Sequence, residues 1–221
     1  MSTSYESCSG STAITLTNVS SALYLLTVGL YKQVHALFST KEEPTVVFHG
    51  GIYRGTEGVK RLYIDNFQAR FVGGRNGPNY GFLLDHPQFQ EIIDVDADGL
   101  HAKVRARTLM QAGLHETALN KDDPSSRDHV PRQWWEGGIY ENQYVKEDGK
   151  WRILVLNYHG LWHATFEEGW AYASSERTLY SNYSHTSPEF VPFPTETYPK
   201  NPLGPDELDP GASLTLCPTC H

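Results

Sequence analysis

Three side chains that could hold the oxygen atoms of a small molecule alternate along one stretch of the sequence: Tyr140, Asn142 and Tyr144. Residues two apart on a strand point to the same face of a sheet, so these groups would form one row. An aromatic, apolar face with a few hydrogen-bonding groups is typical of a small-molecule pocket wall. It also fits an ordinary sheet face whose polar groups have found partners. If the chain then folds back as a hairpin, the same face gains Trp151, Ile153, Val155, Asn157 and His159.

The hairpin that would position these rows runs from Trp134 to Phe166. Asp148-Gly149 lies between two stretches of strand-forming residues, and Asp-Gly in that setting is a strong signal for a two-residue turn. With that turn, Val145 pairs with Arg152. The opposite face of the hairpin then carries Ile139, Glu141, Gln143, Leu154, Leu156 and Tyr158.

A second predicted hairpin would bring further polar side chains into the interior. If Asp98-Gly99 forms its turn, the resulting register puts arginine side chains on the same face as His86. An arginine there would bind a carboxylate or an enolate-like oxygen of a ligand. The alternative is an ion pair between such an arginine and Glu136 or Glu141. The face in question carries His86, Gln88 and Gln90 from one strand, and Arg105, Arg107 and Leu109 from the other.

The sequence predicts no metal site. Cys217-Pro-Thr-Cys220-His221 has the spacing of half a zinc site, but the three cysteines of the chain leave no second pair to complete it. His159 and His163 have no carboxylate at ligand spacing, and we expect no three ligand-type residues to converge elsewhere.

Composition excludes several classes of function. The 221 residues carry 18 Lys and Arg against 26 Asp and Glu, a net charge of −8, and contain no basic run. We therefore expect no nucleic-acid partner. No apolar stretch approaches the length of a membrane span, so no membrane association is expected. The polar start of the chain lacks the pattern of a signal peptide, which predicts a cytoplasmic protein.

The order of predicted elements favours an α+β fold, because helices come first and long antiparallel strands follow. We expect a flexible N-terminus over 1–17, one domain over 18–173 and a Pro-rich tail over 174–221 that packs on the domain or on a partner subunit. One predicted helix covers 21–38, with a stripe that contains Leu26 and Val34. The other covers 57–71 and is capped by Thr56, and its inward-facing residues are Val59, Leu62, Tyr63 and Phe67. Predicted strands cover 45–49, 52–54, 81–95 and 100–112, followed by a long loop over 113–133 and the hairpin.

Several stretches resemble the SnoaL-like, scytalone-dehydratase-like branch of the NTF2-like superfamily. The resemblance covers residues 20–173 and implies a cone, in which a curved, mostly antiparallel sheet wraps around N-terminal helices. It rests on Ala36-Leu37-Phe38 with Gly51-Ile-Tyr-Arg-Gly55, on Asp85-His86-Pro-Gln-Phe-Gln90, on the 138–151 stretch of the hairpin, and on Phe166-Glu-Glu-Gly-Trp170.

The same resemblance implies an enzyme without a cofactor, in which a histidine on the first long strand is the general base. His86 occupies that position. The family pairs this histidine with an aspartate on the first helix, but the corresponding position falls near Thr27, and nothing acidic is nearby. A lone histidine can still accept a proton near neutral pH, because its ordinary pKa is about 6.5.

Three functions remain open on this basis. The first is a lyase or isomerase, a dehydratase or cyclase of polyketide-like or polycyclic small molecules in secondary metabolism, in which His86 abstracts a proton and Tyr140 and Asn142 stabilise developing charge. The second is a cyclase that works by shape without a base. The third is a non-catalytic carrier or interaction module. The residues expected to bind the substrate are Tyr31, Tyr53, Gln88, Arg107, Tyr144, Trp151, Asn157 and Tyr158.

Two further expectations concern assembly. Ile139, Leu154 and Leu156 make the predicted outer face unusually apolar, and with the resemblance this favours a homodimer or homotrimer. The tail is rich in proline and aromatic residues, so Phe190–Pro202 is predicted to pack as a strap on the domain or on a partner subunit.

Overall fold

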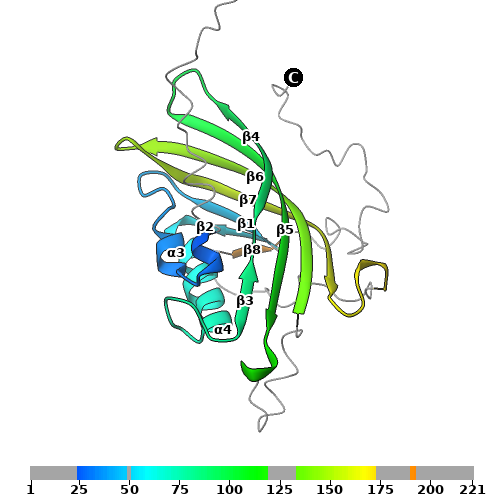
Figure 1. The fold of residues 1–221 in the computed structure, drawn as a ribbon. Helices are drawn as coiled ribbons and strands as arrows, with labels where there is room; N and C mark the ends of the chain where they lie inside the picture. Colours follow the sequence, from blue (N-terminus) through cyan, green and yellow to red (C-terminus); the bar gives the residue numbers. More distant parts are fainter. Residues whose placement is uncertain (1–23, 49–50, 119–132, 173–189, 193–221) are drawn as a thin grey trace, which may run out of the picture.

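The architecture is α+β, as predicted: one curved sheet wraps around a short helical layer (Figure 1). The computed structural model describes residues 24–48, 51–118, 133–172 and 190–192. Within these residues the sheet has eight strands in the order β3-β5-β6-β7-β1-β2-β8, and β4 also pairs with β5. The strands are β1 Thr45–Phe48, β2 Gly51–Arg54, β3 Phe82–Asp85, β4 Gln88–Val95, β5 His101–Leu114, β6 Gln133–Glu147, β7 Lys150–Thr165 and β8 Phe190–Pro192.

The first helical segment is broken, which corrects the prediction of one helix over 21–38. A helical turn over 24–27 is separated from α2, Tyr31–His35, by Gly29 in the left-handed conformation with φ of 70°. A Cβ on Gly29 would lie 2.5 Å from the carbonyl oxygen of Gly77. The lack of a side chain at Gly29 therefore lets the loop after the second helix pack against the break. Leu26 and Val34 are buried, as expected.

The second helical segment is continuous from 55 to 72. It consists of α3, Gly55–Lys60, a π-helical stretch η1, Arg61–Gln68, and α4, Ala69–Val72. It begins at Gly55 and has no side-chain cap, so the predicted cap at Thr56 is wrong. The predicted inner face is correct, because its four members are all buried: Val59, Leu62, Tyr63 and Phe67.

The strand predicted over 81–95 is divided into β3 and β4. The break is at His86-Pro87, where proline has no N–H to donate to the ladder with β5. Beyond it, a bulge lies at Gln90, whose φ is 54°, and the register shifts between the pairs Phe89–Arg107 and Ile92–Arg105. The turn register was predicted correctly, but the bulge reverses which residues of β5 share a face with His86.

The hairpin of β6 and β7 forms around Asp148-Gly149, with Val145 opposite Arg152 as predicted. A second bulge follows, because Tyr144 pairs with Ile153 whereas Gln143 pairs with Val155. The extra residue in β7 reverses its faces beyond this point. Leu156 and Tyr158 are therefore buried on the inner face, and Val155, Asn157 and His159 are not, which corrects the predicted pattern.

A buried carboxylate fixes the hairpin to the segment after α2. Glu147 accepts hydrogen bonds from the Ser39 hydroxyl at 2.5 Å and from the Thr40 and Lys41 backbone N–H groups at 3.2 Å. Burial acts to raise the pKa of Glu147, but these hydrogen bonds outweigh it and hold the pKa below its ordinary value. These bonds hold the turn end of the hairpin against residues 39–41.

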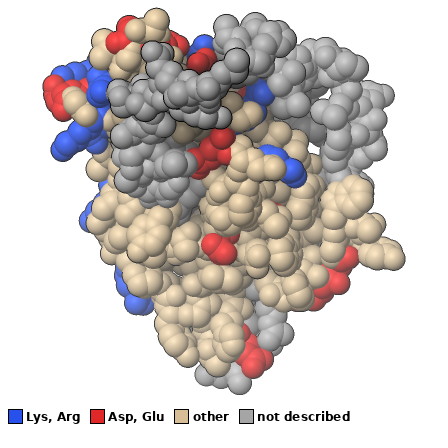
Figure 2. Space-filling model, turned by 45° about the horizontal axis from the view of Figure 1, so that its top comes forward, with Lys and Arg blue, Asp and Glu red and all other residues tan. Residues whose placement is uncertain are grey.

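Several predicted features lie partly or wholly outside the described residues. β8 pairs antiparallel with β2, with Tyr53 opposite Phe190, so this part of the tail joins the sheet edge. Residues 1–17, most of the 113–133 loop, and the rest of the tail with Cys217 and Cys220 lie outside the described residues, and the strap remains a prediction. In the described part of the chain, no helix is long and apolar enough to cross a bilayer. Lys and Arg are scattered over the face in Figure 2, with largely uncharged surface between them.

Candidate active site

His86 lies inside the curve of the sheet at the end of β3, and only 7% of it is exposed. The Thr108 hydroxyl donates to the Pro87 carbonyl at 2.8 Å, which fixes the segment that carries the imidazole. His86 Nε2 lies 3.0 Å from the Tyr140 hydroxyl on β6. Either group can be the donor, depending on the histidine tautomer.

The Tyr140 hydroxyl keeps its proton over the physiological range. Burial, and next the neighbouring Tyr63 and Glu136, raise the pKa of Tyr140 well above its ordinary value of 10. A buried hydroxyl of this kind can donate a hydrogen bond to a substrate oxygen that gains negative charge.

A second hydrogen-bonded pair lies beside the first. Glu136, 4% exposed, accepts from the Tyr158 hydroxyl at 2.5 Å. The Tyr158 ring lies 4.8 Å from the ring of Tyr140 and 6.2 Å from that of His86, measured between centroids. These four side chains form a continuous buried group, which we call the His86 cluster: His86, Tyr140, Tyr158 and Glu136.

Asn142 has two hydrogen bonds within the sheet. Its amide oxygen accepts from the backbone N–H of Asn157 at 3.1 Å, and its amide nitrogen donates to the Tyr144 hydroxyl at 3.3 Å. The first bond supports the backbone beside the bulge, next to Tyr158. These contacts favour a positioning role for Asn142, and its predicted catalytic role stays a prediction.

The other aromatic candidates belong to the core around the cluster. Tyr31 and Tyr53 are fully buried, and Tyr144 and Trp151 nearly so. Burial raises the pKa of Tyr144, against the lowering effect of the hydrogen bond from Asn142. Phe48 stacks on Tyr158 at 5.7 Å. The interior is thus largely aromatic, with the His86 cluster set into it.

Three predicted binding residues lie elsewhere. Arg107 is exposed on the outer face of β5, because the bulge at Gln90 changes the register, so the prediction of an arginine beside His86 is wrong. Gln88 is half-buried next to the break after β3, and Asn157 is half-buried on β7 outside the inner row. The alternative of an ion pair is confirmed for Arg105, whose Nη2 lies 2.5 Å from Glu141 Oε1.

Glu136 was not among the residues predicted to form the site. It was considered only as an ion-pair partner, although Glu136, Gly138 and Tyr140 alternate and so share a face. Tyr158 was among the expected binding residues, although the predicted strand pattern put it on the opposite face, and the bulge in β7 turns it inward.

The expectation about ligand-type residues also needs correction. Asp96, Asp98 and His101 converge in the turn between β4 and β5, with ligand atoms within 4.8 Å of one another. Asp98 accepts from the Leu100 N–H at 2.7 Å and contacts His101 Nδ1 at 2.9 Å, so the cluster stabilises an exposed turn.

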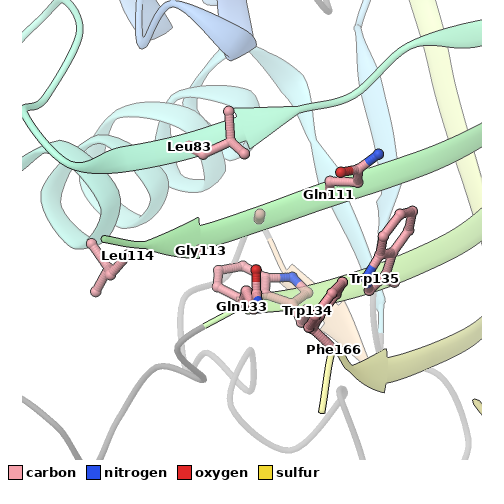
Figure 3. Close-up of a pocket in the computed structure, with 9 residues that line it drawn as sticks. Leu83, Gln111, Gly113, Leu114, Gln133, Trp134, Trp135 and Phe166 are labelled. Atoms are coloured by element: carbon pink, nitrogen blue, oxygen red, sulfur yellow. The ribbon is translucent and has the colours of Figure 1, made fainter. Parts of the chain in front are cut away.

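A shallow pocket of about 130 Å³ lies on the opposite side of the sheet from His86. Figure 3 shows Leu83, Gln111 and Trp135 around it, with Phe166 beside Trp135. The Trp135 and Phe166 rings stack 6.2 Å apart, and Phe166 is 53% exposed. This outer groove combines Leu83, Trp135 and Phe166 with the polar Gln111 and Gln133, on the opposite face of the sheet from the His86 cluster.

Residues 19–157 match the model of a protein family described as SnoaL-like domain. No curated protein matches the chain. Three of the similar solved structures share low sequence identity with it. A protein named "Putative Scytalone Dehydratase" from Novosphingobium aromaticivorans is 18% identical, with a TM-score of 0.49 over 67% of this chain and 83% of that one. The hexachlorocyclohexane dehydrochlorinase LinA-type3 from Novosphingobium barchaimii is 16% identical, with a TM-score of 0.44 over 67% of this chain and 86% of that one. ActVI-ORFA from Streptomyces coelicolor is 10% identical, with a TM-score of 0.46 over 66% of this chain and 92% of that one.

Proposed function

The chain belongs to the SnoaL-like domain family, and from this premise we propose that it is a cofactor-independent lyase or isomerase with His86 as its general base. The observation that supports the proposal is the buried pair of His86 and Tyr140, whose polar atoms lie 3.0 Å apart inside an aromatic interior. A histidine and a neutral hydroxyl at this distance can act together on one carbonyl compound.

The proposed chemistry begins with a carbon–hydrogen bond beside a carbonyl group. His86 accepts the proton, and Tyr140 donates a hydrogen bond to the oxygen that becomes an enolate. In an isomerase the protonated histidine returns the proton to a different carbon. In a dehydratase the enolate expels a hydroxyl group, which takes the proton from the protonated His86 and leaves as water. Both reactions are redox-neutral, so neither requires a redox cofactor.

The proposed substrate is a flat, polycyclic or polyketide-like molecule. Aromatic side chains from the helices and from the sheet meet in the core around the His86 cluster, and they favour contact with extended planar rings. Phe48 and Phe67 pack edge to face at 5.4 Å, and Phe67 contacts Tyr63 in the same manner at 5.6 Å.

The proposal can be tested with a panel of cyclic β-hydroxyketones and polycyclic phenols, by following turnover and binding separately. We expect His86→Ala to abolish turnover of an accepted compound while binding, measured by calorimetry, changes little. The control is His159→Ala, which alters an exposed histidine on β7. Partial loss in His86→Ala would favour a cyclase that works by shape. Binding without turnover by the unmodified protein would favour a carrier.

A further inference from the structure

We infer that Glu136, held in place by Tyr158, is a positioning residue that provides the counter-charge for the protonated form of His86. The inference rests on the proposed function for its catalytic consequence, but the electrostatic relationship can be measured without a substrate. It assigns a task to a buried carboxylate that the proposed chemistry does not use directly.

The geometry begins with the inner row of β6, where Glu136, Gly138 and Tyr140 succeed one another. A Cβ on Gly138 would lie 2.4 Å from Cε2 and 2.6 Å from the hydroxyl of Tyr158. The missing side chain at Gly138 therefore provides the space in which the Tyr158 ring lies, between Glu136 and Tyr140. Glycine at this position is a requirement of the close approach.

The Tyr158 hydroxyl donates a hydrogen bond to the Glu136 carboxylate. A hydrogen bond of this kind stabilises the ionised form of the carboxylate. A carboxylate that is 4% exposed is costly to bury unless such partners stabilise its charge. The arrangement thus favours ionised Glu136 inside the protein.

Burial alone would make His86 a poor base. Removing an imidazolium from water disfavours the charged form, whereas a nearby negative charge favours it. Tyr158 contacts both Glu136 and His86, so a single side chain separates the carboxylate from the imidazole. In a water-poor interior, the charge of a carboxylate one side chain away still raises the pKa of the imidazole appreciably.

Other titratable groups also lie around His86 and Glu136. His163 on β7 pairs with Glu136 in the sheet, and the charge of Glu91 on β4 raises the pKa of Tyr144. His86 itself is faced by Tyr140 from β6 and Tyr158 from β7, while Tyr63 from η1 and Tyr144 from β6 act on Tyr140. Burial raises the pKa of Tyr63, Tyr140 and Tyr144 well above 10, so these three remain neutral. From β5 the inner row contributes Thr108 and Met110, which do not titrate, and Asp85 on β3 is exposed.

The test is an NMR titration of His86 in the full-length protein, with ¹³C-labelled histidine and the His86 signal assigned from His86→Gln. We expect its pKa to lie above about 6.5 in the unmodified protein. Glu136→Gln should lower it by about one unit, and the acid limb of any pH–rate profile should move to lower pH by the same amount. Glu136→Asp, which disturbs packing but keeps the charge, should retain most of the elevation.

An unchanged His86 pKa in Glu136→Gln, or equal changes in the Gln and Asp variants, would overturn the inference. If Glu136→Gln does not fold, the unmodified protein decides alone, since a His86 pKa below 6.5 would show that no counter-charge acts. The signal of His101, in the remote β4–β5 turn, is the internal control. If Glu136 does not affect the His86 pKa, the proposed function still stands, because the proposed function is tested by turnover in His86→Ala.

Discussion

The Tyr158 hydroxyl lies 2.5 Å from the carboxylate of Glu136. The two residues come from the paired strands β7 and β6, and both side chains lie on the inner face of the sheet. The contact depends on two local features, the bulge that turns Tyr158 inward and the absence of a side chain at Gly138. Together they place a carboxylate next to the pair of His86 and Tyr140.

Gly138→Ala should displace the Tyr158 ring, because the added methyl group would overlap it. Overpacking of this kind typically costs about 1–3 kcal/mol of unfolding free energy. Urea unfolding measures the loss, and turnover should fall with it. Gly74→Ala is the matched control, since open space surrounds Gly74 and only its left-handed backbone, with φ of 77°, opposes the change. Equal effects of the two variants would show that the gap at Gly138 is unimportant.

Asn142→Leu should destabilise the bulge in β7, because the Asn157 N–H loses its acceptor. An unsatisfied buried donor costs about 1–3 kcal/mol. Hydrogen exchange of the Asn157 amide should accelerate in the variant, while the Lys146 amide, which donates to the Leu100 carbonyl in the sheet, serves as reference. Unchanged protection at Asn157 would contradict the positioning role of Asn142.

Glu147 should make stability depend on pH. Its hydrogen bonds hold the folded-state pKa below the unfolded value, so the carboxylate stabilises the fold above about pH 4.5 and loses this effect as the pH falls through the folded pKa. We expect Glu147→Gln to cost about 1–3 kcal/mol at pH 7 and progressively less below pH 4. Urea titrations at both pH values measure the difference. Glu42→Gln, at an exposed neighbour, should show neither effect.

Alternation and turn chemistry were enough to predict the hairpin register, the buried face of the second helix and the inward position of Tyr140. They could not reveal the bulges at Gln90 and near Leu154, because a non-glycine residue with positive φ and an extra strand residue leave no periodic signal. Each bulge reversed a face, which moved Arg107 out and Tyr158 in. Glu136 was within reach of sequence reasoning, since it alternates with Gly138 and Tyr140.

We expect the protein to form a homo-oligomer, although part of the original reason has changed. Leu156 lies inside, but Leu83, Trp135 and Phe166 form the outer groove, and Phe166 is largely exposed. A light-scattering mass above that of one 24.9 kDa chain at micromolar concentration is the expected result. Phe166→Glu should reduce the mass if the groove lies in the interface. A single-chain mass for the unmodified protein would contradict the expectation.

The most direct measurement of the central claim is hydrogen exchange at carbon, followed by NMR in D₂O with an accepted ketone. If His86 is the general base, the protein should catalyse uptake of deuterium beside the carbonyl, and the rate should rise with pH through the His86 pKa. His86→Gln should reduce that rate by at least about 100-fold, the usual contribution of a positioned base, whereas His159→Ala should leave it unchanged. Exchange in His86→Gln at the rate of the unmodified protein would contradict the claim.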